Sequence, residues 1–282
     1  MTFRNNLGET IFKQKYARFT DQTWEEKARD LAQIVRVSND YHLEDEVFNA
    51  INTMKFIPGG RYLYYAGRDA KFYNNCFLFK SKEDTRDEWA SLMYDVTASL
   101  MSGGGIGNDY SIFRPHGHLL GRTGGEASGP IPLMEMVNET GRNVMQGGSR
   151  RSAMYASLNW QHGDIERFLY IKDWEHQYIK GAFNSDGSPM TVKDAKEADF
   201  NYRAPLDMTN ISVNYDDAWL DYTFSSNRSL HEDEYKIHLH PTFVHNVRQA
   251  MKNGEPGFSF NFGDKQNETA RNALTSYSAL AA

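Results

Sequence analysis

The chain has 282 residues, 40% of them hydrophobic, which is enough to bury a substantial core in one large domain or two. Its net charge of −6 and pI near 5.9 indicate no basic face, so we expect no nucleic-acid partner. The mean hydropathy of −0.67, the lack of an apolar run long enough to cross a membrane and the lack of a secretory signal predict a cytoplasmic protein.

The N-terminal ~55 residues show helical periodicity. Thr20 and Asp21 are placed to cap a helix over residues 23–37, and apolar residues at helical spacing predict a second helix over residues 42–57. The Pro-Gly-Gly sequence that follows breaks the periodicity. We therefore expect a helical N-terminal region that ends before residue 58.

Strands and helices alternate over the rest of the chain. We predict strands over residues 72–79, 110–115, 154–160, 208–213 and 258–262. We predict helices over residues 88–101, 131–146, 165–172 (capped by Asp164) and 241–254, with a polar, irregular stretch over 175–205. This alternation is typical of an α/β parallel sheet or barrel.

The only cysteine of the sequence is Cys76. A lone thiol can form neither an intramolecular disulfide nor a thiolate metal site by itself. If Cys76 does redox work, its partner lies on another chain or on a part of the protein outside this sequence; the alternative is a buried structural thiol. Asn74 and Asn75 precede it and could hold a polar substrate beside the sulfur, or could be turn residues before a strand.

Two glycine-rich segments could build a site. Residues 102–109, SGGGIGND, either bring backbone N–H groups close to an anion or make a tight connection between a helix and a strand. They lack the lysine of a Walker loop and the strand-to-helix order of a dinucleotide-binding turn. In QGGSRRSA, Arg150 and Arg151 could grip phosphates or bases, or form a solvated basic turn. His238 and His240 share a strand face, but no further ligand completes a metal site there.

The order of these motifs points to one family. The segments FIPGGR, YNNCF, SGGGIGND, SIFRP, SGPIPLMEMVNETGRNVMQGGSRRSA, DIERFL, DMTNISV, GEPGFSF and NETARNA resemble, in this order, the large catalytic chain of ribonucleotide reductases. The resemblance covers most of residues 50–273 and is strongest to the adenosylcobalamin-dependent class. It implies a helical region over residues 1–56, the first half of a ten-stranded α/β barrel over 57–273 with substrate and effector loops, and a divergent tail over 274–282.

The resemblance also implies roles for single residues. Cys76 matches the cysteine that, with a second cysteine on a later strand, reduces the ribose 2′ carbon and becomes a disulfide. Asn75 matches the position that holds the substrate beside that cysteine, and Gly59 and Gly105 match segments that line the substrate pocket.

An allosteric site is implied as well. Arg150 and Arg151 lie in the segment that resembles the specificity loop between effector and substrate. Arg114 and one of the two carboxylates Asp84 and Asp87 resemble the positions that bind a dNTP or ATP effector, and which aspartate aligns is open. The implied partners are a ribonucleoside di- or triphosphate, the effector, adenosylcobalamin and a thioredoxin-like reductant.

The end of the sequence departs from the family pattern Asn-x-Cys-x-Glu. Asn272 fits, but Leu274 stands in place of the radical-bearing cysteine and Ser276 in place of the glutamate. We therefore expect this chain not to reduce ribonucleotides alone. It could be completed by a C-terminal half chain or act as a homodimer; alternatively, it is a non-catalytic dNTP-binding module or the truncated product of an interrupted gene. The final ALAA resembles a degradation tag or is a disordered tail.

Overall fold

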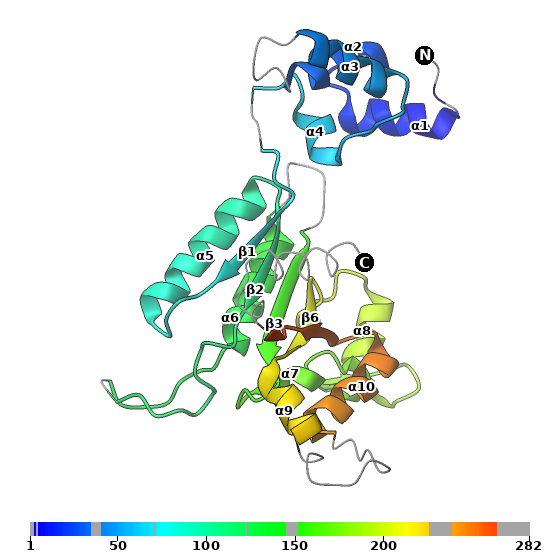
Figure 1. Cartoon of the computed structure of the whole chain (residues 1–282). Helices are drawn as coiled ribbons and strands as arrows, with labels where there is room; N and C mark the ends of the chain where they lie inside the picture. The colour runs from blue at the N-terminus through cyan, green and yellow to red at the C-terminus, as the bar shows by residue number, and fades with distance from the viewer. Residues whose placement is uncertain are drawn as a thin grey trace, which may run out of the picture. The chain divides into compact units, whose positions relative to one another are not determined.

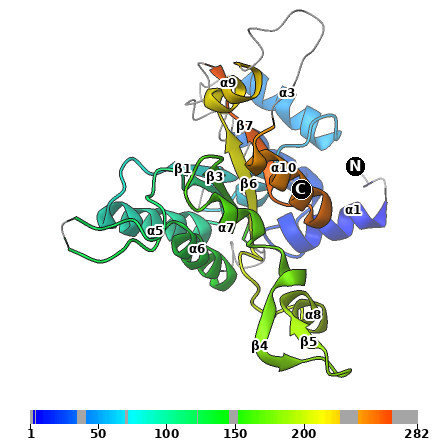
Figure 2. The same cartoon turned by 90° about the horizontal axis from the view of Figure 1, so that it is seen from below.

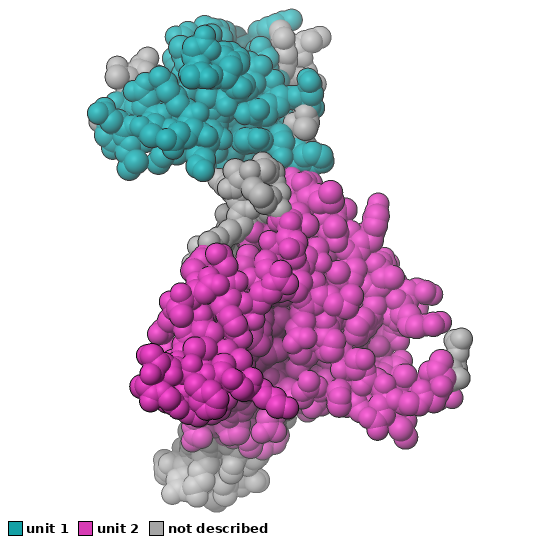
Figure 3. Space-filling model, turned by 180° about the vertical axis from the view of Figure 1, so that it is seen from behind, with its two compact units in different colours: residues 1–75 teal, residues 76–282 magenta. Residues whose placement is uncertain are grey.

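A computed structural model describes residue 3 and residues 5–34, 41–69, 72–121, 123–144, 152–225 and 239–263. The chain divides into two compact units, residues 1–75 and residues 76–282, coloured separately in Figure 3. The sequence placed a boundary between residues 56 and 57, whereas the first unit of the structure also takes in α4 (Gly60–Tyr65). Leu63 of this helix packs in one buried cluster with Trp24 and Leu31, which explains its place in the helical unit.

The helical unit consists of short elements. These are α1 (Asn6–Ile11), a π-helical segment (Phe12–Tyr16), α2 (Trp24–Ile34), α3 (Tyr41–Asn52) and α4. The cap of α2 is Thr23 rather than the predicted pair Thr20 and Asp21. The Thr23 hydroxyl accepts from the backbone N–H of Glu26 at 3.2 Å, and the Glu26 carboxylate accepts from the backbone N–H of Thr23 at 2.8 Å. This reciprocal Thr-x-x-Glu bonding satisfies two donors at once, which a cap farther upstream could not do.

The second unit is built on a parallel sheet with strand order β1-β2-β3-β6-β7 (Figure 1). Its strands are β1 (Cys76–Lys80), β2 (Gly105–Asp109), β3 (Met154–Asn159), β6 (Thr209–Tyr215) and β7 (Gly257–Phe260). Its helices are α5 (Arg86–Met101), α6 (Ile131–Asn143), α7 (Ile165–Tyr170), α8 (Val192–Ala198), α9 (Asp217–Ser225) and α10 (Pro241–Asn253). The alternation of strands and helices thus forms the α/β parallel architecture that the sequence predicts.

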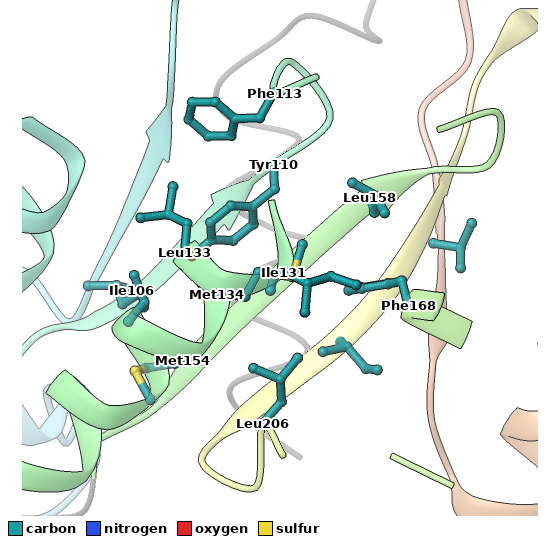
Figure 4. Close-up of a cluster of buried hydrophobic side chains, with 14 of the residues drawn as sticks. Ile106, Tyr110, Phe113, Ile131, Leu133, Met134, Met154, Leu158, Phe168 and Leu206 are labelled. Carbon is teal, nitrogen blue, oxygen red and sulfur yellow. The ribbon is translucent and has the colours of Figure 1, made fainter. Parts of the chain in front are cut away.

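One face of this sheet forms the core. Alternate residues of each strand point to the same face, and the parallel register aligns them across strands, as in Ile106 with Met154 and Leu158 with Val213. These side chains pack with residues of α5, α6, α7, α9 and α10 in one buried cluster, part of which Figure 4 shows. The helices therefore cover a single, apolar face of the sheet.

Two predictions around the first glycine-rich segment are wrong. The strand is Gly105–Asp109, inside the segment read as a loop, and residues 110–115, predicted as a strand, form turns and irregular structure. A methyl group at Gly104 would lie 2.4 Å from the ring of Phe77, so the chain before β2 passes too close to β1 for a side chain. Glycine lowers strand propensity, and this close approach is what masks the strand in the sequence.

Residues 175–205 are more regular than predicted. They contain the antiparallel pair β4 (Tyr178–Phe183) and β5 (Pro189–Thr191), followed by α8, and Figure 2 shows the three elements together at one end of this unit. Thr191 and Asp194 form a reciprocal capping box at the start of α8. Exposed hairpins carry little apolar periodicity, which is why the pattern does not show them.

The longest helix described, α5, has 16 residues. Among the described helices, none combines the length and apolar character that a membrane span requires.

Truncating a core side chain should destabilise the second unit. Leu158 on β3 is fully buried, so Leu158→Ala should lower the free energy of unfolding by roughly 2–5 kcal/mol, from lost burial plus a cavity. Leu119→Ala is the control, because Leu119 is 73% exposed and its loss should change stability by less than about 0.5 kcal/mol. Urea unfolding followed by tryptophan fluorescence measures both, and equal effects would contradict the assignment of this core.

Candidate functional site

The face of the sheet opposite the helices is polar. Its members, aligned across the strands by the printed register, are Cys76, Leu78, Lys80, Gly105, Gly107, Asp109, Tyr155, Ser157, Asn159, Asn210, Ser212, Asn214, Gly257 and Ser259. We call this set the polar face. This layer of hydroxyls, amides and glycines contributes little hydrophobic packing, and its polar side chains on β3, β6 and β7 are mostly buried.

Cys76 and Gly105 lie side by side on the polar face. They begin β1 and β2, are direct Cα partners in the register, and Cys76 is half-buried. Gly105 is buried and places no side chain next to the thiol. Asn75 directly precedes Cys76 and is exposed, and within the helical unit its amide nitrogen would lie 4.0 Å from a methyl group placed on Gly59. The four residues that the resemblance assigns to the substrate thus form two pairs, Gly59 with Asn75 in the first unit and Cys76 with Gly105 in the second.

Tyr155 and Asn214 are polar-face residues that the sequence did not single out. The Asn214 amide donates to the Ser157 hydroxyl at 2.9 Å. The Tyr155 hydroxyl is buried and makes no hydrogen bond within the described part of the chain. Burial raises the pKa of Tyr155, although the nearby hydroxyls of Ser212 and Ser259 act in the opposite direction. Its phenol therefore stays protonated and can donate to a ligand. Polar residues alternate along β3 at Tyr155, Ser157 and Asn159, and this alternation could have revealed Tyr155 from the sequence.

Asp109 closes the polar face at the end of β2. Desolvation raises the pKa of its carboxyl group, opposed by hydrogen bonds from the hydroxyl and backbone N–H of Ser111 and by the charge of Lys80. The Ser111 hydroxyl in turn accepts from the backbone N–H of Asn159 at 2.8 Å. The ends of β2 and β3 are therefore joined by a hydrogen-bonded chain from Asp109 through Ser111 to Asn159.

A pocket of about 740 Å³ lies at the same end of the sheet. The start of α5 and the loop of residues 113–129 form most of its walls, and Asp84, Asp87, Trp89 and Arg114 are among its lining residues. We call it the α5 pocket. An aromatic ring, carboxylates and an arginine in one opening suit a ligand with a base, a sugar and an anionic group.

Asp84 and Arg114 form the charged centre of the α5 pocket. The Asp84 carboxylate accepts from the backbone N–H of Arg114 at 3.1 Å and pairs with its Nε, and the Asp84 carbonyl accepts from Nη2 at 3.1 Å. Within the described chain Nη1 of Arg114 makes no hydrogen bond, so it remains available to an anion. Both Asp84 and Asp87 line the pocket, but of the two it is Asp84 that holds the arginine.

The remaining site predictions divide between the described residues and those outside them. His240 caps α10, its Nδ1 accepting from the backbone N–H of Thr242 at 3.2 Å, and its ring packs edge-on against Trp160 and Tyr222. His238 lies outside the described residues. So do Arg150, Arg151, Asn272, Leu274 and Ser276.

Comparison with known proteins identifies the fold and the family. Residues 74–271 match the family model described as the barrel domain of ribonucleotide reductase. The chain belongs to the ribonucleotide reductase family. Its structure is similar to that of the class Id ribonucleotide reductase alpha subunit of Actinobacillus ureae, with a TM-score of 0.63 and 14% identity, over 91% of this chain and 40% of the other. At this identity the structural likeness shows the fold alone.

Curated relatives of two kinds match part of the chain. A vitamin B12-dependent ribonucleoside-diphosphate reductase of Thermoplasma acidophilum is 30% identical over 138 residues, which are 49% of this chain and 18% of the relative. A ribonucleoside-diphosphate reductase large subunit of Danio rerio is 31% identical over 145 residues, again 49% and 18%. The matched region thus spans less than a fifth of the length of either relative.

The raised pKa of Asp109 predicts a pH-dependent stability. The folded chain holds the carboxyl proton more tightly than the unfolded chain, so this stabilisation is complete below the ordinary pKa of about 4 and is lost as pH rises through the folded value. Relative to Asp109→Asn, the wild type should therefore lose stability with rising pH. Urea midpoints measured from pH 4 to pH 8 test this, and a pH-independent difference would contradict it.

Asp186→Asn is the matched control. Hydrogen bonds from Ser188 lower the pKa of this exposed carboxylate, so its stabilisation is present above the ordinary pKa and is lost as pH falls. The stability difference between wild type and Asp186→Asn should therefore stay constant from about pH 5 to pH 8 and fall only as pH approaches 4.

Proposed function

We propose that this chain supplies the first half-barrel of a ribonucleotide reductase catalytic unit, with Cys76 as one of the two thiols that reduce the ribose. The observation that carries the proposal is the register of Cys76 with Gly105 on the polar face of a barrel-domain sheet. Cys76 is half-buried, and its register partner Gly105 adds no side chain between the thiol and a bound sugar.

The chemistry requires more than this sequence contains. Ribonucleotide reduction replaces the 2′-hydroxyl group with hydrogen and releases water, while two thiols lose two electrons and two protons and become a disulfide. The sequence holds one cysteine, so the second thiol and the radical-bearing thiol come from residues it does not contain. A complementing C-terminal half chain is the proposed source, and a thioredoxin-like protein is the proposed reductant of the resulting disulfide.

The substrate and the radical source are also proposals. We propose a ribonucleoside diphosphate, because the curated relatives are named ribonucleoside-diphosphate reductases. We propose adenosylcobalamin as the radical source on the sequence resemblance and on the relatives from Thermoplasma acidophilum and Mycobacterium tuberculosis named vitamin B12-dependent. Relatives named large subunit match at similar identity, so the assay must include the cofactor as a variable. The small polar groups of the polar face fit a sugar rather than a corrin ring, and no residue of this chain is assigned to the cofactor.

A second candidate function is a nucleotide-binding module that does no chemistry. It is favoured by the α5 pocket, whose carboxylates and arginine are in place in this chain. Both functions use this pocket for a dNTP, with Asp84 and Arg114 as the charged contacts. Only the reductase uses Cys76.

The two functions differ in an activity assay. The chain is mixed with the polypeptide encoded immediately downstream, CDP and dithiothreitol, with and without adenosylcobalamin, and dCDP is measured. We expect dCDP from the mixture and none when Cys76→Ser replaces the wild type, because a hydroxyl cannot form the disulfide. The substitution should leave dTTP binding unchanged. Equal product formation by Cys76→Ser would overturn the redox role, and dTTP binding without product from any mixture would favour the module.

Nucleotide binding tests the α5 pocket directly. Asp84→Asn keeps the shape of the side chain but removes the charge that orients Arg114, so dTTP affinity should fall about tenfold. Asp186→Asn, on the hairpin turn and absent from the pocket lining, should bind like the wild type. Calorimetric titration of dTTP with Mg²⁺ into each variant measures this; undiminished affinity in Asp84→Asn would reject the pocket as the nucleotide site.

A further inference from the structure

The loop of residues 113–129, which forms one wall of the α5 pocket, is hydrogen-bonded to a turn that does not line the pocket. The turn is His162-Gly163-Asp164, between β3 and α7. His162 Nε2 lies 2.6 Å from the carbonyl oxygen of Phe113, and an Asp164 carboxylate oxygen accepts from the backbone N–H of His116 at 2.9 Å. The two bonds therefore grip the loop on both sides of Arg114.

The bonds within the turn define the histidine tautomer. His162 Nδ1 lies 3.0 Å from the backbone N–H of Asp164 and accepts from it, so the ring proton is on Nε2 and is donated to Phe113. Each ring nitrogen thus has one defined role. A side chain that lacks either function cannot reproduce both bonds.

The turn and the loop are also in close contact. A methyl group on Gly163 would lie 2.7 Å from Pro115, and a methyl group on Gly129 would lie 2.4 Å from the Asp164 carboxylate. Gly129 itself lines the α5 pocket. No side chain fits between the turn and the wall, so a shift of the turn must shift the wall.

Asp164 is not the helix cap that its sequence position predicts. It occupies the N-cap position of α7, yet its side chain makes no capping hydrogen bond and turns to His116 instead. The Asp164 carboxylate thus bonds the pocket loop instead of the first N–H groups of α7.

We propose that His162 and Asp164 are positioning residues of the nucleotide site: they act through Phe113 and His116 to hold Arg114 at the geometry that a dNTP phosphate requires. The inference rests on the proposed use of the α5 pocket. It adds two residues that do not line the pocket: the sequence marks Asp164 only as a helix cap and does not single out His162.

Conservative variants separate positioning from mere stability. Gln places an amide N–H near the position of His Nε2, whereas the shorter Asn does not reach it. His162→Asn should therefore weaken dTTP binding about tenfold, and His162→Gln should restore most of it. In the same way, Asp164→Asn keeps an acceptor for the His116 N–H and should bind more tightly than Asp164→Ala.

Ile211→Ala is the stability control, because it opens a cavity in the buried core on β6 and removes no hydrogen bond to the loop or the turn. It should lower the unfolding midpoint and leave dTTP affinity unchanged. The inference is overturned if His162→Asn binds like the wild type, or if Ile211→Ala loses as much affinity as His162→Asn. If the wild type itself does not bind dTTP, the proposed nucleotide site fails, and this inference fails with it. Loss in Asp84→Asn with no loss in His162→Asn overturns the inference alone.

Discussion

The parallel register of the five-stranded sheet is the constraint on which the rest of this molecule depends. In such a sheet, aligned residues of neighbouring strands face the same side, so one choice of register assigns every side chain to the core or to the polar face. A shift of one residue at β1 would turn Cys76 toward the helices and Phe77 toward the polar groups. Burial of the apolar face under the helices stabilises this register, and the register keeps the Cys76 thiol on the polar face.

Parallel strands also separate two sites. Strand starts share one edge of the sheet, and there Cys76 and Gly105 lie together. Strand ends share the other edge, and there the turns after β1, β2 and β3 bring Asp84, Arg114 and His162 into one hydrogen-bonded group. At about 3.3 Å per residue, a five-residue strand keeps the two edges roughly 15 Å apart. The thiol and the α5 pocket are thus positioned by the same strands while remaining distinct.

Buried charge in this unit is mostly kept away from the polar face. Asp207 is paired with Arg142 of α6 and Lys196 of α8, and Asn138 adds a hydrogen bond. Burial alone would raise the pKa of Asp207, but these partners lower it, so it stays ionised. Such a pair mainly fixes which elements meet, because removing one partner leaves an uncompensated charge. The polar face, by contrast, consists largely of neutral groups, which suits binding of sugar hydroxyls without attracting or repelling charge.

The sequence by itself determined the α/β class, the order of most strands and helices, and the family, because apolar periodicity and ordered motifs are local or collinear properties. It also indicated Cys76, Gly105, Asp84 and Arg114. It did not show the strand through Gly105–Asp109 or the hairpin after α7, since glycine-rich and exposed segments carry no periodicity. It also did not show the place of α4 in the helical unit, which depends on the packing of Leu63 against distant residues.

Only the tertiary structure decided which residues share a site. Tyr155 lies on the polar face because of the register of β3 with β2 and β6. Asp84, rather than Asp87, bonds Arg114, which lies 30 residues away in the sequence. The residues that follow Asp164 predict it to be a helix cap, yet its carboxylate accepts from the backbone N–H of His116, 48 residues away. Local propensity describes what a residue does for its own segment. The partner it finally bonds is set by which segments the sheet brings together, and that information is not local.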